Sequence, residues 1–237
     1  MFGIRIADLN IEIHNQYPYA EQFCAEFLSE FETPDITVRV TPEEIEEERA
    51  SDPYHSDNGY LECICIYRNI ALELPKFDAM VFHASVVALD GEGYAFAAQS
   101  GTGKSTHTAL WLRAFGSRAV IVNGDKPIFR RIGGKWYAYG TPWRGKEGLG
   151  GKLRAPLCSI CFLERGTENT ITKIDDAAAL ARLFSQVLLP KEPIMADRFL
   201  SLLDHLIVAT PLYLLHCNMQ QEAAVIAHDG MCKGERI

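Results

Sequence analysis

The sequence predicts an α/β protein in which a core of mixed sheet and helices follows a β-rich N-terminal lobe. Three observations indicate this fold class. Residues 2–14 alternate between apolar and polar side chains, as a half-buried strand does. From about residue 79 the pattern becomes strand, glycine turn, strand, glycine loop and helix, as in α/β proteins. The 237 residues, 48% of them hydrophobic, suffice for one substantial core with a small appended lobe.

The N-terminal lobe contains one clear helix signal. Residues 35–40 alternate again and predict a second strand. A helix should follow, because Thr41 is a good N-cap, Pro42 suits the first helical position and Glu44 completes a capping box. The acidic residues of this helix favour a solvated face over a docking face for a basic partner.

The remaining elements follow from apolar runs between turn signals. Residues 61–67 and 70–74 are interpreted as a hairpin, and a boundary near residue 76 divides the lobe, 1–75, from the core, 76–237. In the core we expect strands at 81–89, 94–98, 119–122, 127–132, 136–139 and 212–217, and helices at 102–115, 175–189, 196–209 and from about 220.

The acidic composition limits the partners. With 23 Lys and Arg against 31 Asp and Glu, the formal charge is −8, which argues against a nucleic-acid binder, because such a protein needs a basic face. Residues 202–215 are the most apolar stretch, but Asp204, His205 and Pro211 interrupt it, so we expect no membrane span. The first residues lack the pattern of a secretory signal, and we expect a cytoplasmic protein.

The seven cysteines do not form a disulfide pattern, because their number is odd and their spacing irregular. Cys63 and Cys65 would share one face of the predicted strand, and Cys158 and Cys161 form a CxxC pair, so a zinc site is one interpretation. Both pairs lie in strongly apolar runs, where a free cysteine behaves as a small hydrophobic residue, and core packing is favoured.

The motif AQSGTGKS at residues 98–105 has the spacing of a phosphate-binding loop, with alanine at the first glycine position. An apolar strand precedes it and a helix follows, as such a loop requires, which disfavours a chance glycine-rich turn. Backbone N–H groups and the helix N-terminus would hold the phosphates. The motif predicts a nucleoside triphosphate with Mg²⁺ and does not distinguish ATP from GTP; we take ATP as the nucleotide, with these residues binding it: Ser100, Gly101, Thr102, Gly103, Lys104, Ser105 and Thr106.

An acidic residue follows the next apolar strand. Asp125 comes just after residues 119–122, in the sequence NGD. It is either an ordinary turn aspartate or a ligand of Mg²⁺ together with the Ser105 hydroxyl, and the phosphate-binding loop upstream favours the metal role.

These motifs resemble a known family. His83, the loop AAQSGTGKST, the sequence NGDKP and the sequence YGTPWRGK are similar to the HPr kinase/phosphorylase-related proteins of the phosphoenolpyruvate carboxykinase-like P-loop superfamily. The resemblance is good over roughly residues 79–165 and looser outside. It implies a carboxykinase-like core of mixed sheet and helices. It also implies that His83 lies beside the transferred phosphate or the metal, although a lone histidine on an apolar strand is often only a core residue.

One position departs from the family pattern. The resemblance implies two acidic residues where this chain has Gly124 and Asp125, one for the metal and one to deprotonate the acceptor hydroxyl. If Asp125 holds the metal, the base is missing or is replaced by His83, Asp90 or His107. Loss of a base slows phosphoryl transfer without necessarily abolishing it.

Residues 140–152 are rich in glycine and positive charge and form either a mobile surface loop or a loop that closes over the phosphates. The resemblance favours the second interpretation, in which Arg144 and Lys146 stabilise charge on the transferred group.

Together these observations predict a kinase that transfers phosphate from ATP to a hydroxyl, with a serine of a peptide or small protein as the acceptor. The predicted catalytic residues are His83, Lys104, Asp125, Arg144 and Lys146. A catalytically reduced nucleotide-binding module that docks a partner is the alternative, and a plain NTPase a third. The resemblance also implies a possible homo-oligomer.

Overall fold

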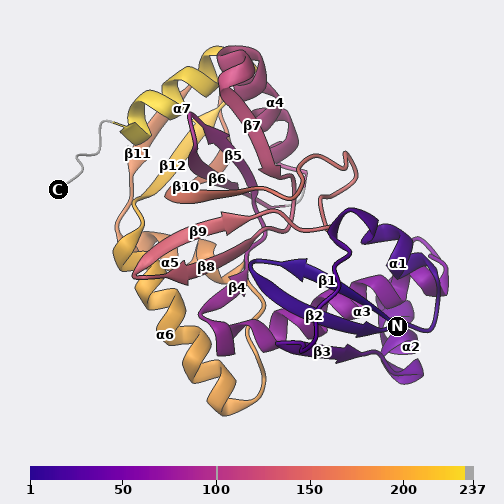
Figure 1. Cartoon of the computed structure of the whole chain (residues 1–237). Helices are drawn as coiled ribbons and strands as arrows, with labels where there is room; N and C mark the ends of the chain where they lie inside the picture. Colours follow the sequence, from indigo (N-terminus) through magenta and orange to yellow (C-terminus); the bar gives the residue numbers. More distant parts are fainter. Residues whose placement is uncertain (100, 233–237) are drawn as a thin grey trace.

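The strands of the computed structural model form a three-stranded and a nine-stranded sheet within residues 1–99 and 101–232, the part of the chain that the structure describes (Figure 1). In the first half of the chain the elements are β1 (Phe2–Ile6), β2 (Leu9–His14), α1 (Tyr19–Phe23), η1 (Ala25–Phe27), β3 (Ile36–Arg39), α2 (Pro42–Ser51), α3 (Asn58–Glu73), η2 (Leu74–Phe77), β4 (Ala79–Val81), β5 (Ser85–Leu89), β6 (Glu92–Ala97) and α4 (Lys104–Phe115). In the second half they are η3 (Gly116–Arg118), β7 (Ala119–Asn123), β8 (Ile128–Ile132), β9 (Lys135–Tyr139), β10 (Arg154–Arg165), β11 (Thr170–Lys173), α5 (Asp176–Phe184), α6 (Pro193–Ala209), β12 (Leu212–Cys217) and α7 (Glu222–Cys232).

The small N-terminal sheet has the order β1-β2-β3. Ala7 and Asp8 form the tight turn between β1 and β2, and their φ angles of 51° and 58° match the twist that a two-residue hairpin needs. The capping box of α2 is confirmed: Glu44 N donates to Thr41 Oγ1 at 3.3 Å, and Thr41 N donates to Glu44 Oε2 at 2.7 Å.

The predicted hairpin at 61–67 and 70–74 is wrong, because these residues form the helix α3. Asp57 caps it by accepting a hydrogen bond from Tyr60 N at 2.9 Å. Leu61 and Cys65 are buried four residues apart, as are Ile66 and Ile70, and all four pack with the inward side chains of the small sheet. Burial of this helical face outweighed the strand propensity of the Ile, Tyr and Cys residues.

The large sheet has the order β4-β8-β9-β10-β6-β5-β7, and β12 extends it by pairing with β10 and with β11. β10 changes partners along its length. Its first residues pair antiparallel with β9, whereas its later residues pair parallel with both β6 and β12. The sheet is therefore mixed, in agreement with the α/β class predicted from the sequence.

Helices cover both faces of this sheet. Alternate residues of β5 point to opposite sides: Val86 packs with the inner faces of α5 and α6, and Val87 packs with α4 and α7. Figure 1 shows α4 and α7 together at one end and α6 running along the opposite side. The helix predicted after Gly101 and the strand predicted at 212–217 are confirmed as α4 and β12.

Two predicted elements are shorter than expected, and both differences shape the candidate site. The strand expected at 81–89 is interrupted at residues 82–84, because β4 pairs with β8 whereas β5 pairs with β6 and β7. The helix expected at 175–189 ends at Phe184, and after a turn at residues 185–186 Val187 forms a β-bridge with Phe82.

The N-terminal sheet and the large sheet share apolar contacts. Val81, Ile128 and Trp143 belong to the same buried cluster as the residues of α3 and the small sheet. Polar contacts add to it, since Tyr139 Oη donates to Asp8 Oδ2 at 2.6 Å. This cluster brings α3 beside the strand ends that carry the candidate site.

Candidate functional site

The predicted phosphate-binding loop connects β6 to α4, between a strand and a helix as its motif requires. Gly101 and Gly103 have φ angles of 78° and 121°, a region that favours glycine, and a Cβ on Gly101 would meet no atom within 4 Å. Gly103 is the N-cap of α4 and has no side chain to accept a hydrogen bond. The first N–H groups of the helix therefore have no side-chain acceptor from the cap residue. Ser100, also predicted at the nucleotide, lies outside the described residues.

Lys104 begins α4, and its ammonium group lies across the loop. Its Nζ donates to the carbonyl oxygen of Ala98 at 3.1 Å. Burial lowers the pKa of Lys104, and the charge of Asp125 opposes this shift. A half-buried cation whose hydrogen bond goes to a neutral carbonyl group is suited to an anionic ligand. Of the neighbouring predicted residues, Ser105 is half-buried and Thr106 is exposed on the same first turn.

His83 and Asp125 form the second part of the site. His83 Nε2 donates to Asp125 Oδ1 at 3.1 Å, and both side chains are 27% exposed, so the pair is accessible from solvent. Burial alone would raise the pKa of the Asp125 carboxyl. The hydrogen bond from His83 and the charges of Lys126, His83 and Lys104 outweigh burial and hold that pKa below its ordinary value.

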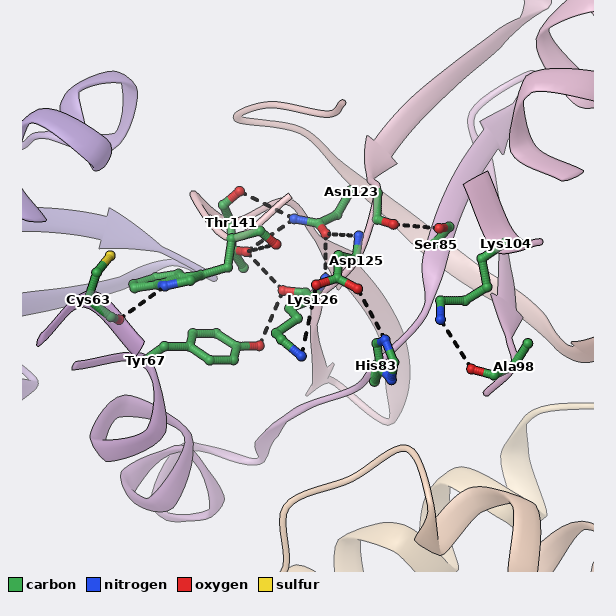
Figure 2. Close-up of polar contacts among 12 residues, drawn as sticks. Cys63, Tyr67, His83, Ser85, Ala98, Lys104, Asn123, Asp125, Lys126 and Thr141 are labelled. Atoms are coloured by element: carbon green, nitrogen blue, oxygen red, sulfur yellow. Dashed lines mark hydrogen bonds and ion pairs between the residues drawn. The ribbon is translucent and has the colours of Figure 1, made fainter. Parts of the chain in front are cut away.

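Strand direction explains why these parts meet. β5 runs antiparallel to both β6 and β7, so β6 and β7 end at the same edge of the sheet. The loop after β6 carries Lys104, the turn after β7 carries Asp125, and the segment before β5 carries His83. Figure 2 draws His83 between the Asp125 carboxylate and Lys104.

His83 is held by its backbone. The sequence predicted that His83 lies on an apolar strand. It lies instead in the interruption between β4 and β5. Its N–H donates to Gln186 O at 2.8 Å, and the following residue, Ala84, donates to Asp125 O at 3.0 Å. The histidine is thereby fixed between the Asp125 turn and the segment that follows α5.

Buried polar residues that sequence reasoning missed hold the Asp125 turn. Asn123 Oδ1 accepts from the N–H groups of Asp125 and Lys126, each at 2.8 Å, and its Nδ2 donates to Thr141 Oγ1 at 3.1 Å. Ser85 Oγ donates to Gly124 O at 2.5 Å (Figure 2). The NGD sequence carried a signal for the first contact, because asparagine side chains often bond the backbone two residues ahead; the partners Thr141 and Ser85 had none.

Gly124 has a steric reason to be glycine. A Cβ there would lie 2.7 Å from the carbonyl oxygen of Arg144 and 3.2 Å from that of Leu149, so the turn has no room for a second acidic side chain. The alternative bases lie elsewhere. Asp90 pairs with Arg118 just after the end of β5, whereas His83 precedes its start. The length of β5, at about 3.4 Å per residue, separates Asp90 from the site by roughly 17 Å. His107 is buried under the loop, with only 2% of its surface exposed.

The glycine-rich loop at 140–152 packs on this turn, but its predicted catalytic cations point to the N-terminal lobe. Arg144 donates to Glu26 Oε2 at 2.5 Å and to Gly150 O at 2.7 Å. Lys146 Nζ lies 5.7 Å from the centre of the Tyr54 ring. In this structure neither is brought to the His83–Asp125 pair, and their assignment to the transferred phosphate stays a prediction.

Two cavities flank the phosphate-binding loop. One, of about 500 Å³, is lined by Gly101, Thr106, Arg165 and the residues after β12. The other, of about 550 Å³, is lined by Gln99, Thr102, Arg165 and the end of α5. Arg165 also donates to Gly101 O at 2.7 Å. Both volumes are in the range of small-ligand sites, so a nucleoside has room beside the loop on either side.

The residues present suit a magnesium nucleotide. Ser105 offers a hydroxyl and Asp125 a carboxylate that stays charged, which are the oxygen donors Mg²⁺ prefers. Within residues 1–99 and 101–232 no group of three His, Cys, Asp or Glu side chains is arranged to hold a metal. Mg²⁺ would therefore take further ligands from phosphate oxygens and water, as it commonly does.

The cysteine pairs are placed as core residues. Cys63 and Cys65 lie on α3 rather than on a strand, and both are buried. Cys161 is fully buried on β10, and Cys158 is half-buried there. None of the helices in the described part of the chain is both long and apolar enough to cross a bilayer.

Comparisons with known proteins give a distant structural match. No family model and no curated protein matches the sequence. Among solved structures, the HPr(Ser) kinase/phosphatase from Coxiella burnetii is similar, with a TM-score of 0.37 and 10% sequence identity. The match covers 65% of this chain and 88% of that one, so the chain bears a distant resemblance to this kinase/phosphatase at the level of fold.

Proposed function

We propose that this protein is a kinase that transfers phosphate from Mg-ATP to a hydroxyl, with a serine of a peptide or small protein as the acceptor. The observation that carries the proposal is the meeting of three separate segments at one sheet edge: the loop before α4 with Lys104, the turn after β7 with Asp125, and the segment before β5 with His83.

Each group has a distinct role in the proposed reaction. The N–H groups at the start of α4 and the Lys104 ammonium bind the phosphates. Ser105 and Asp125 would hold Mg²⁺, which neutralises developing charge on the phosphate oxygens. His83 bonds the Asp125 carboxylate, and so fixes its orientation beside the phosphate position.

The transfer balances as a simple displacement. The acceptor hydroxyl oxygen forms a bond to the γ-phosphorus, the bond from that phosphorus to the β–γ bridging oxygen breaks, and ADP leaves with the electron pair. The hydroxyl proton passes to Nδ1 of His83, the ring nitrogen that does not donate to Asp125. No second acid stands at residue 124, and the proposal therefore assigns the role of base to His83.

The alternative function, nucleotide binding without turnover, is favoured by Gly124. Its contacts with Arg144 and Leu149 leave no space for the additional acid that the family resemblance implies. A binding module would keep nucleotide affinity and dock a partner without phosphorylating it.

The first test is a calorimetric titration with Mg-ATP on the native chain and on Lys104→Ala. We expect saturable binding to the native chain and its loss in the variant, because the variant lacks the ammonium group that binds the phosphates in the proposed reaction. Lys173→Ala, an exposed lysine on β11, is the matched control and should bind normally. Absence of binding to the native chain would reject both functions.

Product analysis then separates the functions. A kinase converts ATP to ADP and adds phosphate to a serine-containing acceptor, seen as a mass shift. A binding module gives affinity without ADP, and an NTPase releases phosphate without any acceptor. Asp125→Asn should remove the mass shift while the fold, followed by circular dichroism, is kept.

A further inference from the structure

A further cavity, of about 930 Å³, lies between α3 and α6, away from the two cavities beside the predicted phosphate-binding loop. It is lined by Arg68, Leu72, Glu73, Lys76, Leu188, Pro190, Lys191, Glu192, Ile194, Met195 and Arg198, which we call the α3–α6 groove. Figure 1 shows the start of α6 passing the end of α3. Ile194 is 67% exposed and Leu188 39% exposed, so apolar side chains line a surface open to solvent.

The rim of the α3–α6 groove is positively charged although the whole chain carries −8. Four cationic side chains and two carboxylates line it. Both carboxylates are engaged locally: Glu73 pairs with Lys76 at 2.5 Å, and Glu192 accepts from the N–H groups of Ile194 and Met195 at the start of α6.

Two of the rim cations remain for an external partner. Within the described residues, Lys191 and Arg198 form no ion pair. Arg198 also lines an adjoining cavity of about 510 Å³, where Lys76, Arg130, Arg131 and Arg198 outnumber the carboxylates of Asp78 and Asp197. An apolar floor with a cationic rim matches a peptide that alternates apolar and acidic side chains.

Both walls of the groove connect to the candidate catalytic centre. On one wall, Leu188 is two residues from Gln186, whose carbonyl accepts from His83 N at 2.8 Å, and about 7 Å of extended chain spans two residues. On the other wall, Arg68 follows Tyr67, whose Oη donates to Lys126 O at 3.4 Å. Each wall of the groove is therefore continuous, within one or two residues of the chain, with a segment that contacts the candidate site.

We propose that the α3–α6 groove docks an amphipathic acidic peptide segment of the phosphoacceptor, with its apolar side chains on Leu188 and Ile194 and its carboxylates on Lys191 and Arg198. The identification of the peptide as an acceptor rests on the proposed kinase function; the docking itself does not. A second copy of the chain is a poorer occupant, because its acidic helix α2 carries one Ile, Ile45, which is buried.

The test uses a random twelve-residue peptide library displayed on phage and selected against the full chain. Selected peptides are synthesised and titrated by fluorescence anisotropy against Ile194→Glu and Arg198→Glu. The matched controls are Val208→Glu, at an exposed position near the end of α6, and Arg113→Glu, at an exposed position of α4. All four positions are at the surface, and thermal melting checks that each variant folds.

We expect an apolar and acidic consensus whose affinity falls about tenfold or more in Ile194→Glu and in Arg198→Glu and is unchanged in both controls. A basic consensus, peptides that bind regardless of these two residues, or no enrichment would overturn the proposal. Concentration-dependent dimerisation of the native chain that Ile194→Glu abolishes would assign the groove to a second copy and also overturn it.

Lys104→Ala separates this proposal from the kinase proposal. Groove-dependent peptide binding that persists in Lys104→Ala, while the native chain neither binds nor turns over ATP, leaves the docking proposal standing and rejects the kinase. If both hold, a serine-containing selected peptide becomes phosphorylated, and Ile194→Glu raises its KM more than it lowers kcat, because the residue binds the peptide and does not touch the reacting atoms.

Discussion

The Asp125 carboxyl is the residue on which the candidate chemistry depends, and its neighbours keep it charged. Burial favours the neutral acid, whereas the hydrogen bond from His83 and three nearby positive groups favour the carboxylate, and the second influence is stronger. A partly buried carboxylate that stays ionised is well suited to bind a metal ion. This balance also makes the contribution of His83 measurable without any substrate.

At this scale we expect His83→Ala to raise the pKa of Asp125, because the variant removes the hydrogen bond and part of the positive charge while burial remains. The measurement is a carboxyl-carbon NMR titration of Asp125. Asp90 is the internal control, since the hydrogen bond from Arg118 lowers its pKa far from the change. An unchanged Asp125 pKa in His83→Ala would show that the pair does not interact in solution.

Sequence reasoning found these residues unevenly. Lys104 and Asp125 are predictable because a phosphate-binding loop fixes its lysine by local spacing and an acid after a neighbouring strand falls at the same sheet edge. The contact of Asn123 with Thr141 joins residues 18 positions apart, after the chain has passed through β8 and β9, so no local pattern indicates it. Arg144 shows the limit of composition: it is conspicuous in the sequence, yet its partner, Glu26, lies in another part of the chain.

Among the elements, α4 carries a pH-sensitive contact beneath the phosphate-binding loop. His107 Nε2 accepts from Trp111 Nε1 at 3.1 Å, and the ring packs against Phe96. Burial lowers the pKa of His107 from 6.5 to about 4. Between these pH values the unfolded chain binds a proton that the folded chain does not, so the free energy of unfolding falls as pH drops from about 6.5 to about 4.

We therefore expect His107→Gln to flatten this dependence, because glutamine keeps an acceptor for Trp111 but does not titrate. Urea unfolding at pH 7 and pH 5 measures it: the loss of stability on acidification should be smaller in the variant. His205→Gln, at an exposed histidine on α6, should leave the native dependence unchanged. Equal acid dependence in the native chain and His107→Gln would contradict the assignment.

The elements themselves were predictable where one signal was sufficient. The capping box set the start of α2, and the glycine loop set the start of α4. In α3, strand-favouring residues fill a helix that is capped by Asp57 and buried over most of its surface, so local propensity and tertiary burial disagree. The early end of α5 at Phe184 depends on the pairing of Val187 with Phe82, which no local pattern indicates.

At the scale of the whole molecule, the N-terminal lobe completes the core of the larger part. Trp143 Nε1 donates to Cys63 O at 3.2 Å, and Arg130 Nη1 donates to Ala7 O at 2.6 Å. Val81 and Ile128 pack in the same buried cluster as α3. Removing residues 1–75 would expose this apolar surface and leave these polar groups without partners.

We therefore expect a fragment of residues 76–237 not to fold independently. Its near-ultraviolet circular dichroism should be weak and its thermal transition broad, whereas the full chain should melt cooperatively. A cooperative transition in the fragment, with Mg-ATP binding equal to that of the full chain, would contradict this expectation and support two separable domains.

The exchange of partners along β10 has a mechanical consequence. Pro156 and the residues before it pair with β9, whereas the residues from Leu157 onward pair with β6, and from Ile160 also with β12. One continuous strand therefore joins the edge that carries the phosphate-binding loop to the strands that face the N-terminal lobe. Opening between these two regions would have to twist or break that strand. Any large motion that admits a substrate must instead occur in the loops at the sheet edge. Because the later half of β10 is paired on both sides, its amide hydrogens should be among the slowest in the protein to exchange with solvent.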